Sequence, residues 1–173
     1  LMLMLGRIDQ ILVVSMIGGS EYGRYAFLKQ LLQQPITIIS AIHYQYFFTK
    51  FCRIISYSKK VVSYYYFSLI PALVSYCVYL GLLFSLYQWS DIFPDYPLRS
   101  NLSYVLILAS LLVLGRDTFV SVSLAARLIR VQIYGSIFVL LAALLLVPLI
   151  NRYGIEIYIL MNALSGLIAL IAI

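Results

Sequence analysis

Long apolar runs separated by short polar segments restrict the fold of this chain more than any other feature of its sequence. There are about six of these runs, and they cover residues 1–18, 24–48, 61–89, 102–125, 131–150 and 155–173. A helix needs about 20 apolar residues to cross the hydrocarbon core of a bilayer. The pattern therefore predicts an all-α fold, a membrane helical bundle of about six transmembrane helices that forms a single domain over 1–173.

The composition leaves no room for a sizeable water-soluble domain. Hydrophobic residues make up 64% of the chain and charged residues 10%, and the mean hydropathy is +1.00. Such values lie outside the range of soluble globular domains. In a chain of this kind the net charge of +6 is better explained by membrane topology than by nucleic-acid binding, because Lys and Arg gather in loops that stay in the cytoplasm.

The basic residues between the runs predict the orientation of the chain. Alternating crossings place six basic loop residues on one side: Lys50, Arg53, Lys59, Lys60, Arg127 and Arg130. The loops on the other side hold three basic residues beside four acidic ones: Arg24, Arg99 and Arg152 with Glu21, Asp91, Asp95 and Glu156. The excess of positive charge then puts both termini of this segment in the cytoplasm.

Both ends of the sequence lie in apolar runs and lack the polar or basic anchors that usually end a spanning helix. We therefore expect this chain to be a segment of a longer protein. Pro35, Pro71 and Pro148 lie within or near the ends of the runs. Each permits a kink, which suits a transporter, although proline is also simply commoner in membrane helices than in soluble ones.

Charged side chains inside the runs are the best functional candidates. At the centre of a spanning helix such a residue costs about 2.5 to 3.5 kcal/mol on insertion scales, so it faces protein or a water-filled cavity. Arg116 and Asp117 lie more than halfway through the fourth run, about 100° apart, so they can share a polar face and partly neutralise each other. Arg7 and Asp9 project about 200° apart, so one of them needs an outside partner unless Arg7 is an ordinary interfacial anchor. Lys29 either serves a function or reaches back to the interface on its long stem.

The other chemically capable residues predict no catalytic or metal site. His43 is the sole histidine, and because its segment lacks an acidic partner we interpret it as an interfacial residue near the cytoplasmic end of its helix. Cys52 and Cys77 have neither CxxC spacing nor nearby His, so we interpret both as packing residues. No Ser-His-Asp set, phosphate-binding glycine loop or metal cluster stands out, and we expect neither an enzyme nor a bound cofactor.

Two stretches resemble one family of membrane proteins. They are Gly6-Arg7-Ile8-Asp9-Gln10-Ile11-Leu12-Val13-Val14-Ser15 with Ile17-Gly18-Gly19-Ser20-Glu21-Tyr22-Gly23-Arg24-Tyr25-Ala26, and Leu146-Val147-Pro148-Leu149-Ile150-Asn151-Arg152-Tyr153-Gly154-Ile155. The first looks like the segment of polysaccharide flippases in which an Arg-x-Asp helix ends in Gly and a Gly-x-Tyr opens the next helix. The second is similar to the link before their last helix. The chain thus resembles the O-antigen (Wzx-type) flippases of the multidrug/oligosaccharidyl-lipid/polysaccharide exporter superfamily, although the family's Gly-x-Gly-Ala-Ala is replaced by Glu156-Ile157-Tyr158-Ile159.

The resemblance implies one of two six-helix lobes around a central cavity, the C-terminal one, in the bacterial inner membrane. It implies alternating-access transport of undecaprenyl-pyrophosphate-linked oligosaccharide, with membrane lipids and the missing other lobe as further partners. Arg7, Arg116 and Lys29 would bind the diphosphate-sugar headgroup, a task that suits arginine because its guanidinium binds phosphate oxygens bidentately. Asp9 and Asp117 would orient the arginines or couple transport to an ion.

Other functions stay open. A small-molecule or multidrug exporter of the same superfamily would favour acidic and aromatic cavity residues. A membrane-embedded glycan polymerase or acyltransferase would carry a large extracytoplasmic loop or a His-Asp arrangement in the membrane, and neither is visible in the sequence. A purely structural membrane subunit would leave Arg116 and Asp117 as an internal ion pair that binds nothing.

Overall fold

The computed structural model describes four helices and a few residues near them. The described residues are 19–55, 61–89, 98, 100–125 and 154–171, with the pairs 133–134, 137–138, 141–142 and 145–146. The helices are α2 (Gly19–Ile55), α3 (Val61–Trp89), α4 (Asn101–Ala125) and α6 (Ile155–Ile171). This part of the chain contains helices and no strands, so the all-α prediction is confirmed for it.

α2 is longer than the apolar run that predicts it. It covers 37 residues, or about 55 Å at 1.5 Å per residue, instead of the predicted 24–48. Residues 19–21, predicted as part of a turn, and residues 49–55, predicted as part of a basic loop, are helical. The prediction is wrong at both ends because backbone hydrogen bonds continue the helix beyond the apolar residues that a bilayer core requires.

α3 has the predicted bounds, and α4 begins one residue earlier than predicted. Ser100 forms the cap that starts α4. Its carbonyl accepts the backbone N–H of Ser103 at 3.0 Å and of Tyr104 at 3.2 Å, and its Oγ accepts the Ser103 N–H at 3.3 Å. Serine is favoured at this position because its hydroxyl satisfies an N–H that the first turn leaves without a helical partner. At the start of α6 the preceding residue is Gly154, whose φ of +84° costs a glycine little.

Two of the described helices are long and apolar enough to cross a membrane. These candidate spans are Ser63–Gln88 in α3 and Asn101–Leu124 in α4, with mean hydropathies of 2.0 and 1.9. α6 contributes a shorter apolar segment, Ile155–Ser165, and α2 is not among the candidates. The described residues thus give two candidate spans rather than the predicted six. The predicted helix over 1–18 lies outside the described residues, and the one over 131–150 lies largely outside them.

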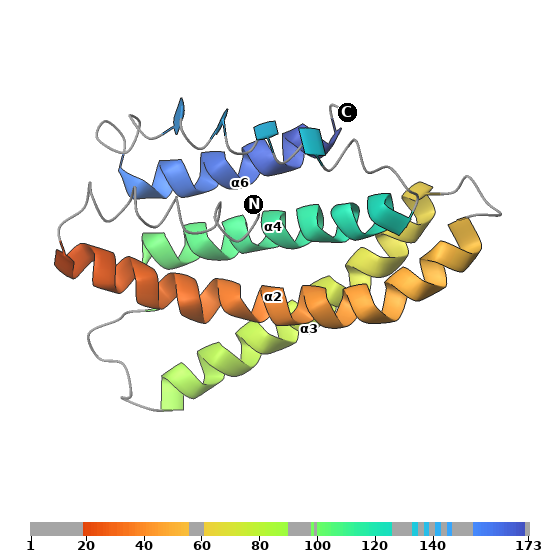
Figure 1. Ribbon diagram of the computed structural model, residues 1–173. Coiled ribbons are helices and arrows are strands. Elements are labelled where there is room, and N and C mark those ends of the chain that lie inside the picture. Colours follow the sequence, from red (N-terminus) through yellow and green to blue (C-terminus); the bar gives the residue numbers. More distant parts are fainter. Residues whose placement is uncertain are drawn as a thin grey trace.

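α2, α4 and α6 run in the same direction, and α3 runs against them (Figure 1). The beginnings of α2, α4 and α6 meet in one hydrophobic cluster, which α3 reaches near its end through Phe84. Phe47 and Phe51 near the end of α2 pack with Val122 near the end of α4, and Tyr64 at the beginning of α3 lies beside them. Helices that span a bilayer one after another along the chain alternate in direction, as α2, α3 and α4 do.

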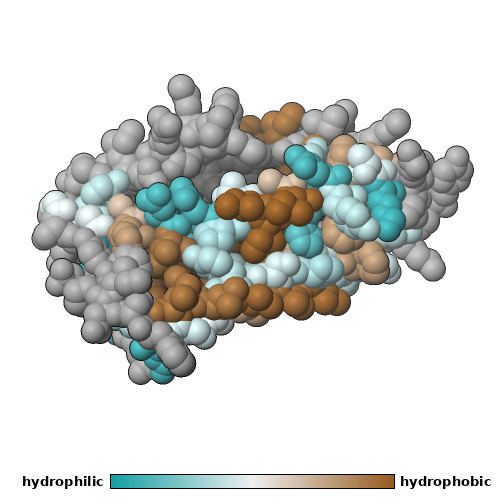
Figure 2. Space-filling view, turned by 90° about the horizontal axis from the view of Figure 1, so that it is seen from below, coloured by the Kyte–Doolittle hydropathy of each residue, from teal (hydrophilic) through white to brown (hydrophobic). Residues whose placement is uncertain are grey.

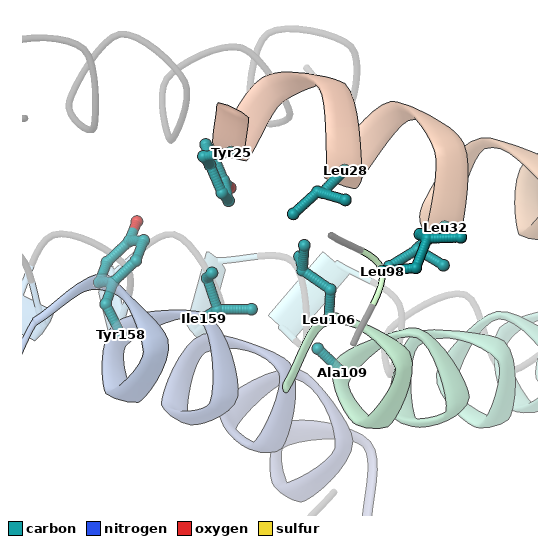
Figure 3. Packing of buried hydrophobic residues seen from close by; sticks show 8 residues of the cluster. All are labelled: Tyr25, Leu28, Leu32, Leu98, Leu106, Ala109, Tyr158 and Ile159. Atoms are coloured by element: carbon teal, nitrogen blue, oxygen red, sulfur yellow. The ribbon is translucent and has the colours of Figure 1, made fainter. Parts of the chain in front are cut away.

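The largest core cluster joins α2, α4 and α6 (Figure 3). Its buried members are Tyr25, Leu28, Leu32, Leu98, Leu106, Ala109, Tyr158 and Ile159. A second cluster ties α3 to α2 and α4, and consists of Ile36, Ala72, Tyr76 and Leu114. The small side chain of Ala72 at this contact lets the backbones of neighbouring helices approach closely, as small residues do in membrane bundles.

Large apolar side chains lie on the outside of the bundle while small hydroxyl side chains lie inside. Exposed apolar residues recur every three or four positions along α3: Phe67, Ile70, Val74, Val78, Leu82 and Leu86. The buried polar residues of the described part all carry hydroxyls: Ser68, Ser103, Ser110, Thr118 and Ser123. Only 11% of the apolar window of α3 is buried, and Figure 2 shows apolar side chains spread over the face that it views. Soluble monomers rarely expose so much contiguous apolar surface.

Candidate functional site

Arg116 and Asp117 form an ion pair on α4, as two neighbours on a shared polar face can. Nε and Nη2 of Arg116 donate to the same oxygen, Asp117 Oδ1, at 3.0 and 2.9 Å. The two side chains are 33% and 31% exposed, so each is partly shielded by the bundle. The contact uses two of the five N–H donors of the guanidinium, which leaves donors that an anionic group can engage.

A small polar cavity lies beside Asp117, between α2, α3 and α4. Its lining residues come from all three helices: Ser40, His43, Tyr44, Ser68, Ala72, Asp117, Thr118 and Ser121. Its volume of about 10 Å³ has room for roughly one water molecule. The cavity is therefore far too small for a sugar or a diphosphate, and Arg116 is not among its lining residues.

Two hydroxyls of α4 that line the cavity donate to backbone carbonyls of the same helix. Thr118 Oγ1 donates to the Leu114 carbonyl at 2.8 Å, and Ser121 Oγ donates to the Asp117 carbonyl at 2.9 Å. Serine and threonine often bond the carbonyl four residues back when they lie within a helix. Each hydroxyl keeps its lone pairs, so α4 presents mainly hydrogen-bond acceptors to the cavity.

Lys29 lies well away from this pair. Its Nζ is 5.4 Å from the centroid of the Tyr25 ring, a cation–π contact, and Tyr25 belongs to the cluster at the beginning of α2. The cavity residue Ser40 follows Lys29 by eleven positions, about 16 Å along a helix. The structure therefore does not bring Lys29 together with Arg116. The other predicted site residues, Arg7 and Asp9, lie outside the described part of the chain.

His43 and the two cysteines differ from their sequence interpretations. His43 lies within α2, twelve residues before its end at Ile55, and stacks on Phe47 with ring centroids 5.4 Å apart, so it is not near a helix end. Cys52 and Cys77 are exposed rather than packed in the core. Among the residues searched, no group of three or more His, Cys, Asp and Glu side chains is placed to hold a metal ion.

Two tyrosines of α3 donate to carbonyls of α2, and one of them replaces the hydrogen bond that the proline inside α2 removes. Pro35 lacks an N–H, so the carbonyl of Leu31, four residues earlier, loses its helical partner. Tyr79 donates its hydroxyl to that carbonyl at 2.8 Å, and Tyr76 donates to the next one, Leu32, at 3.0 Å. Neighbouring side chains often satisfy proline-freed carbonyls within membrane bundles. The contact fixes α3 against the middle of α2, next to the cavity.

Sequence reasoning missed the cavity and the tyrosine contacts. The signal for the cavity was present as polar residues three or four positions apart within apolar runs, such as Ser40 with His43 and Asp117 with Ser121, since these spacings put side chains on one helix face. Nothing in the sequence shows that these two faces meet.

The chain matches no protein-family model, no curated protein and no solved structure. The resemblance to polysaccharide flippases therefore stays a prediction.

Proposed function

We propose that this chain is a membrane-embedded lobe of a flippase that moves lipid-linked oligosaccharide across the bacterial inner membrane, as its resemblance to O-antigen flippases suggests. The observation that carries the proposal is the position of the Arg116–Asp117 pair. Arg116 lies eight residues before the end of the candidate span at Leu124, or about 12 Å, which is close to the middle of a hydrocarbon core about 30 Å thick. Charged groups at that depth usually mark a transport path.

The remaining arrangement of the bundle supports a membrane setting. α3 is an apolar helix with most of its surface outside the bundle, and the helices alternate in direction as successive crossings would. Lipid would cover the exposed side chains, and small hydroxyl residues would fill the helix contacts.

In this proposal the pair on α4 meets the anionic headgroup where this lobe faces a second one. The cavity beside Asp117 holds about one water molecule and is not the headgroup chamber, so the chamber forms between lobes. Arg116 would turn its remaining N–H donors toward the diphosphate, and Asp117 would keep the guanidinium in place meanwhile. Arg7 and Lys29 would add positive charge elsewhere along the path.

The pair itself also favours a second candidate, a structural membrane subunit in which Arg116 and Asp117 only neutralise each other. Their mutual bonds at 2.9 and 3.0 Å are what such a subunit would need. The two candidates differ in what happens when both charges are removed together, because a structural pair is dispensable as a unit whereas a headgroup site is not.

Complementation of a flippase-null strain by the chain in its full-length protein tests the proposal. The test uses the double variant Arg116→Gln with Asp117→Asn, in which both side chains stay polar but both charges are removed. The flippase proposal expects surface glycan to be lost although the protein reaches the membrane in normal amounts. Normal surface glycan in the double variant would favour the structural subunit. Glu156→Gln, a neutralisation on α6, is the matched control and should complement fully.

A further inference from the structure

The polar cavity between α2, α3 and α4 carries an inference that does not depend on the proposed transport function. Among the described side chains, Ser40 Oγ and His43 Nδ1 are buried and have no hydrogen-bond partner, and both residues line this cavity. Leaving a buried donor or acceptor unsatisfied is costly, and buried polar groups in proteins nearly always have a partner. We therefore expect a bound molecule between the helices that forms hydrogen bonds with these two atoms.

We propose that this cavity is a binding site for one water molecule, which joins His43 and Ser40 on α2 to the Asp117 carboxylate on α4 by hydrogen bonds. A volume of about 10 Å³ matches one water, and a buried water usually has two to four polar partners. The cavity supplies three such partners, His43 and Ser40 from α2 and Asp117 from α4.

Hydrogen-bond chemistry selects water over a cation or an anion. The Thr118 and Ser121 hydroxyls already donate to carbonyls, so α4 offers acceptors, and a carboxylate repels an anion. A cation would lie beside Arg116, whose guanidinium already occupies Oδ1 of Asp117. A neutral molecule that both donates and accepts satisfies every group without placing a second positive charge there.

The water would make one hydrogen-bonded unit of His43 and Asp117, two titratable groups from different helices. The other titratable and charged groups around them are Tyr44, which lines the cavity, and Arg116, which binds Asp117. The contacts from α3 are Ser68 and Ala72, neither of which carries charge. The unit thus ties α2 to α4 at the level where α3 crosses them.

The sole histidine makes the test specific. The 173-residue chain is labelled with ¹³C,¹⁵N-histidine and placed in phosphatidylcholine nanodiscs, where the ring of His43, the one histidine of these residues, gives the only labelled side-chain signals. Magnetisation transfer from water to the carbon-bound ring protons, which do not exchange with solvent, reports a water held beside the ring. We expect this transfer in the unmodified protein.

Two variants fill the cavity from different helices. Ser40→Val removes one ligand and adds methyl groups, and Ala72→Val adds volume from α3 without touching a polar residue. Both should lose the transfer. Ser75→Val is the control, because Ser75 is an exposed serine of α3 whose hydroxyl bonds the Pro71 carbonyl at 2.9 Å, and it should keep the transfer. Circular dichroism identifies variants that have not folded. If one of the two filling variants does not fold, the other still tests the proposal.

Three results would overturn the proposal. The first is absence of transfer in the unmodified protein. The second is transfer that persists unchanged in a folded filling variant. The third is a shift of the His43 signals when sodium chloride replaces choline chloride, which would assign the cavity to a cation instead.

Discussion

At the scale of residues, Asp117 joins two kinds of contact, since it binds Arg116 and also lines the polar cavity. Arg116→Gln alone leaves the carboxylate without its partner, and Asp117→Asn alone leaves the guanidinium without its own. Each change should destabilise the protein by on the order of 1 kcal/mol, a modest value because both side chains are about one third exposed. The double variant should lose less than the sum of the two.

Thermal unfolding of the purified protein in detergent measures this cycle. The Glu156→Gln variant again serves as control, and its midpoint should stay close to that of the unmodified protein. If the loss of stability in the double variant equals the sum of the losses in the single variants, the ion pair contributes nothing to stability. Asp117 would then not be the residue that holds Arg116.

Ser100 allows a second prediction at this scale. Ser100→Ala removes the Oγ that accepts the Ser103 N–H, so α4 should lose about 1 kcal/mol of stability, the usual cost of removing a cap. Ser100→Asp keeps an accepting oxygen and should retain most of the stability. Unfolding in detergent distinguishes the two, and equal losses in both variants would contradict the capping role.

At the scale of elements, the proline inside α2 and the contact of α2 with α3 depend on each other. Tyr79→Phe removes the hydroxyl that bonds the Leu31 carbonyl, so a part-buried acceptor is left without this partner at a cost of about 1 kcal/mol. In a Pro35→Ala background the new N–H can reach that carbonyl. We therefore expect Tyr79→Phe to cost clearly less in the Pro35→Ala protein than in the unmodified one.

The measurement is the unfolding midpoint of the four proteins of this cycle. Tyr104→Phe on α4 provides the control, because Tyr104 is 55% exposed and its hydroxyl should matter little in either background. An equal cost of Tyr79→Phe with and without Pro35 would show that the tyrosine does not replace the missing backbone bond.

The bounds of α3 could be predicted from sequence, whereas those of α2 could not. α3 carries no charged residue from end to end, and polar residues flank it, so the apolar run and the helix coincide. α2 continues over Glu21 at its beginning and over Lys50 and Arg53 near its end, and a rule based on apolar length stops at these charges although the backbone continues. The ion pair between Arg116 and Asp117 could be predicted because the two residues are neighbours in the sequence. The contacts between helices could not, because they depend on how the helices pack, which a single sequence does not show.

At the scale of the whole molecule, the alternating directions of α2, α3 and α4 correspond to a definite arrangement in a membrane. If α2, α3 and α4 cross a membrane, their alternating directions in Figure 1 predict that the link from α2 to α3 and the link from α3 to α4 lie on opposite sides. The positive charges of the former predict that it lies in the cytoplasm. The segment after α4 should then lie on the cytoplasmic side as well.

This arrangement can be tested with single introduced cysteines, after the native cysteines have been replaced. In a Cys52→Ser, Cys77→Ser background we expect Asp95→Cys to react with a membrane-impermeant maleimide on intact cells. Lys59→Cys and Arg127→Cys should react only after the cells are permeabilised, because two crossings separate them from each other and one crossing separates each from Asp95. Reaction of Lys59→Cys and Asp95→Cys from the same side would mean that α3 does not span the bilayer, and a lobe without that crossing could not form the wall of a transport chamber.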